Sequence, residues 1–242
     1  MGLVVFLDLY GVLVDSALME RAYNERMAAI LQRRFGGDLE AWRRSQAESY
    51  VWYQQRGAEL DRRDGADREG DAWVEAVADL NASQLGNVLQ RMGVGVPANL
   101  RNLSEAIEEE TVLRIDATYP DAGPALAALR EDGHRLFLST NANRANAESA
   151  LIGGGIREYF DGLLMLETAR AKKDRPYYWR RAFEHAGTSP AEAVVVDDHG
   201  PFLSVAEDLG ARPIQLIRPT LRRQRGRGPV IESLAELPPM LR

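Results

Sequence analysis

The chain has 242 residues, 45% of them hydrophobic, and its formal net charge is -6 at pH 7. That length suffices for one large domain or two small ones with a real core, and the acidic balance argues against nucleic acid as the main partner. The absence of cysteine excludes disulfides, thiol nucleophiles and zinc sites with cysteine ligands, and it suits a reducing cytoplasm.

The first element along the chain is a predicted buried strand that ends in an acid. Val4–Leu7 is an unbroken apolar run, typical of a strand covered on both faces in a parallel sheet, and Asp8 follows it directly. A carboxylate at this place lies at the carboxyl edge of an open α/β sheet, where such folds place their chemistry. On this segment alone, Asp8 could equally cap a turn or the next helix.

The following hundred or so residues have helical periodicity and no strand signal. We interpret 16–115 as an all-helical domain, inserted after the first strand and placed as a cap above the carboxyl edge of the sheet. Predicted helices cover 16–35, 38–56, 71–81, 83–92 and 98–110, with a polar loop at 61–70.

After residue 116, predicted strands and helices alternate, which implies right-handed crossovers and a parallel sheet. We therefore predict an α/β fold, in which 1–15 and 116–242 form a Rossmann-like, three-layer core around a parallel sheet. The later predicted strands are 135–140, 162–166, 193–198 and 213–217, and the predicted helices are 124–131, 145–152, 176–186 and 201–209.

Polar residues follow three of the predicted buried strands, and a lysine pair precedes a predicted helix. These residues are Asp8, Thr140, Asn141, Asp197 and Asp198, together with Lys172 and Lys173. In a doubly wound sheet the carboxyl ends of the strands meet in one crevice. There a carboxylate can attack, hydroxyl, amide and ammonium groups can stabilise charge, and paired acids can hold Mg²⁺. Each residue alone could be a helix cap or a surface charge, but together they indicate a site.

Four motifs in order resemble those of the haloacid dehalogenase superfamily. The segments are LDLYGVL at 7–13, LFLSTN at 136–141, KDRPYYW at 173–179 and VVVDD at 194–198. The spacing from the third-motif lysine to later residues of the pattern fits Lys173 better than Lys172. The resemblance covers about 1–15 and 116–242, and the helical insert is similar to the helical cap of the superfamily.

The resemblance implies a hydrolase that forms an aspartyl-enzyme intermediate on Asp8, which water then hydrolyses. Lys173 would screen the nucleophile and the leaving charge. Thr140 would be the hydroxyl residue of the second motif, and Asn141 after it would contact substrate. Mg²⁺ as a cofactor would be held by Asp8, the backbone carbonyl of Tyr10 and Asp198, with Asp197 nearby.

One departure from the superfamily pattern favours a dehalogenase. Tyr10 stands where phosphatases carry a second Asp as general acid and base, and free tyrosine, with a pKa of ~10, is a poor proton donor near neutral pH. Since such help is worth ~10²–10⁴-fold, its loss would slow phosphomonoester hydrolysis. A tyrosine here resembles the 2-haloacid dehalogenases, where a halide leaves unprotonated. The helix near 42–53 resembles their first cap helix, so Arg43 or Arg44 could bind a substrate carboxylate, unless this helix only packs through its aromatic residues.

The fourth motif favours a phosphatase. Dehalogenases of this type have small polar residues in place of Asp197 and Asp198, need no metal, and keep an Asp at the position of Phe202. They also keep a threonine and a tyrosine where Val12 and Trp179 stand here. An acid pair without a cation would repel the substrate and Asp8, so the pair looks like part of a Mg²⁺ site.

We therefore predict a Mg²⁺-dependent hydrolase that acts on a small phosphorylated metabolite. The first alternative is a metal-independent 2-haloacid dehalogenase, and the second is a catalytically weakened member that binds a ligand or partner. No apolar run reaches the ~20 residues of a membrane span, and the N-terminus lacks the basic region of a signal peptide. We thus expect a cytoplasmic protein with no membrane partner. The basic run at 222–228 is interpreted as a solvated loop, and the sequence predicts no oligomeric state.

Overall fold

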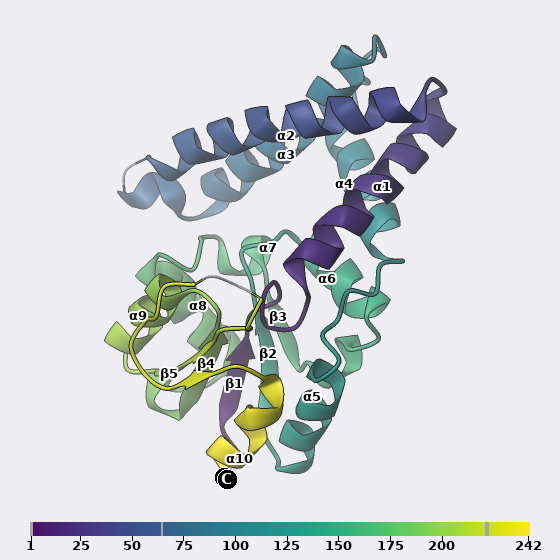
Figure 1. Ribbon diagram of the computed structural model, residues 1–242. Coiled ribbons are helices and arrows are strands. Elements are labelled where there is room, and N and C mark those ends of the chain that lie inside the picture. The colour runs from purple at the N-terminus through teal and green to yellow at the C-terminus, as the bar shows by residue number, and fades with distance from the viewer. Residues whose placement is uncertain (1, 64, 221–222) are drawn as a thin grey trace. The chain divides into compact units, whose positions relative to one another are not determined.

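A computed structural model describes residues 2–63, 65–220 and 223–242. The chain forms two compact units (Figure 1). One unit consists of the stretch up to Ser16 together with Asp116–Arg242, and the other is Ala17–Ile115. Among the described residues, no helix is both long enough and apolar enough to cross a membrane.

A six-stranded parallel sheet forms the centre of the first unit, in the order β3-β2-β1-β4-β5-β6. The predicted α/β fold with a Rossmann-like core is confirmed. The two-residue strand β6 was not predicted, because so short an apolar segment carries no periodicity. The strands are β1 (Val4–Leu7), β2 (Arg135–Ser139), β3 (Gly162–Leu164), β4 (Ala193–Asp197), β5 (Arg212–Leu216) and β6 (Val230–Ile231).

Six α-helices and three short 3-10 turns accompany this sheet. The strand predicted over 162–166 is wrong in its last part, because α7 begins at Leu166. A short apolar run fits a buried strand and a buried helical turn equally well. The helices are α5 (Ala122–Glu131), α6 (Arg144–Gly153), α7 (Leu166–Ala169), α8 (Pro176–Ala186), α9 (Gly200–Asp208) and α10 (Leu237–Leu241), and the 3-10 turns are Arg157–Tyr159, Pro190–Glu192 and Leu234–Glu236.

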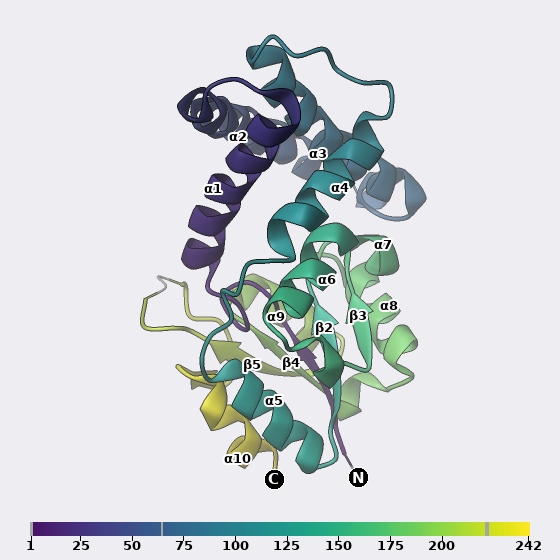
Figure 2. The same ribbon diagram turned by 90° about the vertical axis from the view of Figure 1, so that its right-hand side faces the viewer.

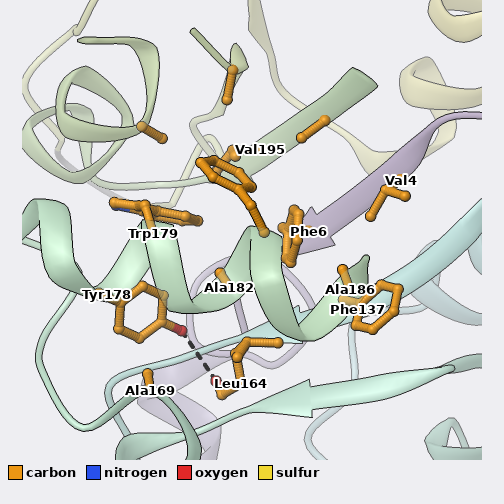
Figure 3. Close-up of a cluster of buried hydrophobic side chains, with 14 of the residues drawn as sticks. Val4, Phe6, Phe137, Leu164, Ala169, Tyr178, Trp179, Ala182, Ala186 and Val195 are labelled. Carbon is orange, nitrogen blue, oxygen red and sulfur yellow. Dashed lines mark hydrogen bonds between the residues drawn. The ribbon is translucent and has the colours of Figure 1, made fainter. Parts of the chain in front are cut away.

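The central strand β1 is covered on both faces. Val4 and Phe6 pack with residues of α8 and α9, and the Phe6 ring meets the Trp179 ring edge-on at 6.4 Å (Figure 3). Side chains alternate along a strand, so Val5 and Leu7 point to the other face, and both are fully buried there. Helix α5 contacts β2 and packs against α10 (Figure 2). Complete burial of the apolar run explains why it reads as uniformly hydrophobic.

The second unit is helical throughout its described residues. Helix α1 ends before two glycines, and the Asp38 side chain caps α2 by accepting a hydrogen bond from the Ala41 N–H at 2.9 Å. The helices predicted over 71–81 and 83–92 are in fact one, because Ala82 is buried and nothing near it breaks the helix. The elements are α1 (Ser16–Phe35), α2 (Leu39–Asp61), α3 (Asp71–Arg91), α4 (Leu100–Val112) and a 3-10 turn, Gly65–Arg68, within the predicted loop.

Arg218, just after β5, ties three distant segments of the first unit together. Its guanidinium donates to both carboxylate oxygens of Asp121, at 2.6 and 2.9 Å, and to the Val12 carbonyl at 2.6 Å. Asp121 also accepts hydrogen bonds from the Ser233 hydroxyl and the Leu234 N–H. Burial alone would raise the pKa of Asp121, but the hydrogen bonds from Arg218 and Ser233 outweigh it and lower the pKa below the usual value.

Replacing Arg218 by leucine should therefore destabilise the protein in a pH-dependent way. We expect the free energy of unfolding to fall by about 2–4 kcal/mol at neutral pH, since a mostly buried carboxylate loses its cation. Because the pKa of Asp121 is lower in the folded state than in the unfolded state, this stabilisation is present above the unfolded value of about 3.9. It is lost as the pH falls through the lower, folded-state pKa.

Urea denaturation of both proteins at neutral pH and near pH 3 measures this difference. Arg227→Leu, which removes a largely exposed cation, serves as the control and should change stability little. A loss of the same size at both pH values would show that Arg218 acts through packing and not through its charge.

Candidate active site

The candidate site lies at the carboxyl edge of the sheet, where three neighbouring strands end. Asp8 follows β1, and its N–H donates to the Val196 carbonyl of β4 at 2.9 Å. Thr140 follows β2, and Asp197 is the last residue of β4. Because all three strands are parallel, their final residues meet at one edge. The structure thus brings together residues that are up to 190 positions apart, from Asp8 to Asp198.

Lys173 lies at the centre of this cluster and joins two of its acids. Its ammonium donates to Asp8 Oδ1 at 2.5 Å, to Asp197 Oδ2 at 2.7 Å and to the Ser139 carbonyl at 3.2 Å. Only 2% of the lysine side chain is exposed. These three acceptors match the three N–H bonds of an ammonium group. Of the two neighbouring lysines, Lys173 is therefore the one that reaches Asp8.

Burial and charge shift the pKa of both members of this pair. Burial raises the pKa of Asp8 to about 7, because desolvation, with the charges of Asp197 and Asp198, outweighs the attraction of Lys173. Burial alone would lower the pKa of Lys173, but the charges of Asp197 and Asp8 outweigh it and raise the pKa to about 12. The ammonium thus stays charged, and the ionised form of Asp8 depends on the cations beside it.

The loop that carries Lys173 is fixed on two sides. Its N–H donates to the Asn141 side-chain oxygen at 2.9 Å, and its carbonyl accepts a hydrogen bond from the Trp179 indole at 3.0 Å. Asn141, predicted to contact substrate, thus holds the lysine loop through its side chain. The Thr140 hydroxyl, which is buried, accepts from the Ala142 N–H at 3.2 Å. Trp179, noted in the sequence only as a departure, positions the lysine.

Three buried carboxylates form a potential cation site. Asp8, Asp197 and Asp198 each offer one oxygen, and these oxygens lie within 4.8 Å of one another. Mg²⁺ and Ca²⁺ prefer hard oxygen ligands of this kind. Asp197 is further oriented by the His199 N–H, which donates to its Oδ1 at 2.8 Å. The donor set therefore fits a divalent cation.

A second cation, Arg223, reaches the same cluster and was missed by the sequence analysis. Its Nε donates to Asp198 Oδ2 at 2.6 Å. Burial raises the pKa of Asp198, and the hydrogen bond from Arg223 offsets part of that rise. Arg223 belongs to the basic run at 222–228, whose composition is typical of a solvated loop; Arg222 lies outside the described residues. Local composition gives no signal of a partner 25 positions away.

Two residues that depart from the superfamily pattern also have defined contacts. The Tyr10 hydroxyl donates to the Asn146 side-chain oxygen at 2.5 Å, from the end of β1 to helix α6. The Phe202 ring lies 5.4 Å from the Lys173 ammonium, within the range of a cation–π contact. The Tyr10 hydroxyl thus donates a hydrogen bond to an amide oxygen, and the Phe202 ring forms an apolar wall beside the lysine.

The arginines predicted to bind substrate lie on α2 of the helical unit. Arg43 forms ion pairs with Glu25 and Glu40 of the same unit, and Arg44 is exposed. Trp42 is buried and donates from its indole to the Gly36 carbonyl at 2.7 Å. These contacts agree with a packing role for Trp42, and substrate binding by the two arginines stays a prediction.

Comparison with known proteins identifies relatives of two activities. Residues 3–201 match the family model of the haloacid dehalogenase-like hydrolases. The chain is 27% identical over 190 residues to phosphoglycolate phosphatase of Cupriavidus necator, across 68% of this chain and 82% of that protein. It is 25% identical over 244 residues to (S)-2-haloacid dehalogenase 1 of Pseudomonas sp., across 97% and 94% of the two chains. The fold also resembles L-2-haloacid dehalogenase of Xanthobacter autotrophicus, with a TM-score of 0.58, 20% identity, and 99% and 98% of the two chains covered.

Removing the central ammonium should destabilise the protein in a way that acid relieves. In Lys173→Met, the Asp8 and Asp197 carboxylates face each other without a cation, so we expect a loss of about 3–5 kcal/mol above neutral pH. Without the ammonium, burial and the charges of Asp197 and Asp198 raise the pKa of Asp8 further in the folded variant, which then binds more protons than the unfolded chain. Its stability should therefore rise as the pH falls toward 5.

Guanidinium denaturation at both pH values measures the effect, and Lys172→Met is the matched control. The ammonium that pairs with Asp8 and Asp197 belongs to Lys173, and the neighbouring Lys172 is only partly buried, so its replacement should cost about 1 kcal/mol or less. An equal loss in the two variants, or no recovery in acid, would contradict a central role for the Lys173 charge.

Proposed function

The chain belongs to the haloacid dehalogenase-like hydrolase family, and on this basis we propose that it hydrolyses a small phosphorylated metabolite with Asp8 as nucleophile and Mg²⁺ as cofactor. One observation carries the proposal: three buried carboxylates converge so that one oxygen of each lies within 4.8 Å of the others. Three buried carboxylates so close together repel one another and outnumber the two protein cations beside them, so the cluster suits a cation-binding role. A phosphatase among the relatives, which acts on phosphoglycolate by its name, supports the same substrate class.

In the proposed reaction the Asp8 carboxylate attacks phosphorus, and the alcohol part of the substrate leaves. Water then attacks the aspartyl phosphate, which releases inorganic phosphate and restores the carboxylate. Lys173 holds Asp8 Oδ1, orients the carboxylate and favours its ionised form. The same ammonium offsets negative charge that develops during the transfer. The helical unit is proposed as the cap, with Arg43 and Arg44 as candidates for substrate binding.

Asp8, Asp197, Asp198 and the Tyr10 carbonyl are the proposed holders of the metal. When bound, Mg²⁺ supplies positive charge and Lewis acidity to the phosphoryl oxygens. Lys173 donates to both Asp8 and Asp197 and so offsets the repulsion between these two acids without the ion. The residues themselves therefore pre-form the donor set within an intact fold.

The tyrosine in place of the usual acid limits the range of substrates. The Tyr10 hydroxyl donates to Asn146, so its proton is engaged outside the path of a leaving alkoxide. A substrate whose leaving group needs little protonation would then react faster than a simple alkyl phosphate. We therefore expect the natural substrate to have a good leaving group, as in an acyl, enol or sugar 1-phosphate.

A 2-haloacid dehalogenase is the second candidate, and two observations favour it. Each buried acid already has a cation of the protein beside it, Lys173 for Asp8 and Asp197 and Arg223 for Asp198, so the charges are nearly balanced without a metal. A halide also leaves without being protonated, so dehalogenation does not need the proton donor that the Tyr10 position lacks. Phe202 argues the other way, because a benzyl side chain cannot activate the water that completes the reaction.

A paired assay separates the two activities. Phosphate release from a panel of phosphate esters and chloride release from 2-chloropropionate are measured, each with and without a chelator. Phosphate release that the chelator abolishes supports the lead proposal. Chloride release that the chelator leaves unchanged replaces it with the dehalogenase, and the absence of both activities refutes both reactions.

Asp8 is the proposed nucleophile. Asp8→Asn should lower either activity by at least about a thousandfold, because the amide cannot form the covalent intermediate. Asp132→Asn, which changes a carboxylate paired with Arg242 far along the chain, is the matched control and should keep the wild-type rate. Circular dichroism shows whether both variants fold. An unchanged rate in folded Asp8→Asn would refute the proposed mechanism.

Tyr10 stands where phosphatases of the superfamily carry an aspartate that acts as general acid. Tyr10→Asp should accelerate hydrolysis of an alkyl phosphate by about 10²-fold, while p-nitrophenyl phosphate, whose leaving group needs no proton, gains little. Tyr10→Phe removes only the hydroxyl and should give no such selective gain. Rates for both substrates are compared in the three proteins. A gain of equal size for both substrates would mean that the new carboxylate does not act as a proton donor.

A further inference from the structure

The loop after β5 places a partly exposed arginine on a buried acid. Arg223 Nε lies 2.6 Å from Asp198 Oδ2, and 37% of the arginine side chain is exposed against 5% of the aspartate side chain. The guanidinium therefore reaches inward from the surface to the acid cluster. Within the described residues, Lys173 pairs with Asp8 and Asp197, whereas Asp198 pairs with Arg223.

A single buried glutamine fixes this loop next to Asp198. The Gln215 side chain is fully buried, and its amide nitrogen donates to the Asp198 carbonyl at 3.0 Å and to the Gln224 carbonyl at 2.9 Å. Its side-chain oxygen accepts a hydrogen bond from the Gly226 N–H at 2.7 Å. One side chain thus holds the backbone of Asp198 and the residue that follows Arg223. Since an unpaired buried amide would be costly, this clamp is a strong constraint on the loop.

Two glycines bring the same loop close to the start of α9. A Cβ atom on Gly200 would lie 2.9 Å from the Gly226 Cα, and a Cβ atom on Gly226 would lie 2.8 Å from the Gly200 Cα. Real Cβ atoms do not approach so closely, so only glycine permits this contact. The fold therefore holds the backbone in place on both sides of the ion pair, which brings the Arg223 side chain within reach of Asp198.

The guanidinium of Arg223 and a divalent cation would compete for the Asp198 carboxylate. Lys173 already spans Asp8 and Asp197, and Arg223 neutralises Asp198. A divalent cation that takes an oxygen from each acid would share Asp198 with the guanidinium. Two cations on one carboxylate repel each other, and the mostly buried setting strengthens that repulsion.

We propose that Arg223 is a tethered competitor of the divalent cation: it binds Asp198 when the metal is absent and withdraws when the metal binds. This inference rests on the cation site of the proposed function. The partly exposed guanidinium can return to solvent at little cost, whereas the buried Lys173 cannot. Arg223 thus lowers the affinity for the metal and protects the fold of the metal-free protein from an unpaired buried acid.

Metal binding without substrate tests the competition. Mg²⁺ titrated into the full chain by calorimetry, and Mn²⁺ followed by electron paramagnetic resonance, give the affinity directly. Arg223→Gln should bind the metal about tenfold more tightly, the equivalent of one charge-assisted hydrogen bond that no longer has to be broken. Arg223→Lys keeps the charge without the planar fork and should lie between the two proteins. Arg225→Gln, in the same loop, is the matched control and should bind as the wild type does.

Thermal denaturation with and without Mg²⁺ provides a second test if Arg223→Gln is unstable without the metal. Its melting temperature should rise more on addition of Mg²⁺ than that of the wild type, since the metal then supplies the missing partner of Asp198. Equal or weaker metal binding by Arg223→Gln would overturn the inference while the cation site stands. No metal binding by any variant would refute the cation site and the inference with it, whereas metal binding without phosphate release would refute only the proposed reaction.

Discussion

The buried ammonium of Lys173 is the interaction on which the candidate site depends. It lies between Asp8 and Asp197, donates to both, and is almost completely hidden from water. Without it, two carboxylates from adjacent strands would face each other in a region where solvent screens little. In the proposed reaction, the same contact that keeps the acids compatible with a folded core also orients Asp8 for attack. Stability and reactivity are therefore linked through one side chain.

The position of that lysine depends in turn on the core beneath it. Trp179 of α8 packs edge-on against Phe6 of β1 (Figure 3). Its indole N–H donates to the Lys173 carbonyl. The Tyr178 hydroxyl beside it donates a shared hydrogen bond to the carbonyls of Leu164, which ends β3, and Thr140, which follows β2. Apolar packing and a few directed hydrogen bonds thus fix the loop from below. This rigidity is what a catalytic carboxylate requires, because misplacement of a reacting group by a fraction of an ångström lowers the rate.

The charges at the edge also frame the choice between the two reactions of the family. Three acids against two cations leave one formal negative charge near Asp8 in the metal-free protein. Under the proposed function, a divalent cation in place of the Arg223 guanidinium would cancel that negative charge and so favour a phosphate dianion, whereas the metal-free balance is closer to what a metal-independent dehalogenase needs. Arg223 shifts this balance, and Tyr10, engaged with Asn146, restricts proton donation in either reaction. Under the proposed function, the preference between the two reactions would follow from which cation occupies Asp198.

The sequence by itself determined the elements whose signals are local: the apolar run of β1, the glycine pair after α1 and the proline that begins α8. It also predicted which acids would meet, because parallel strands end at a common edge and each acid follows a strand directly. Only the tertiary structure decided that α3 is one helix, that α7 replaces the end of a strand, that Tyr10 donates to Asn146, and that Arg223 pairs with Asp198. The physical reason is that periodicity and caps are properties of adjacent residues. The partner of a charge or a hydroxyl, in contrast, is whichever group the folded backbone brings within hydrogen-bonding distance.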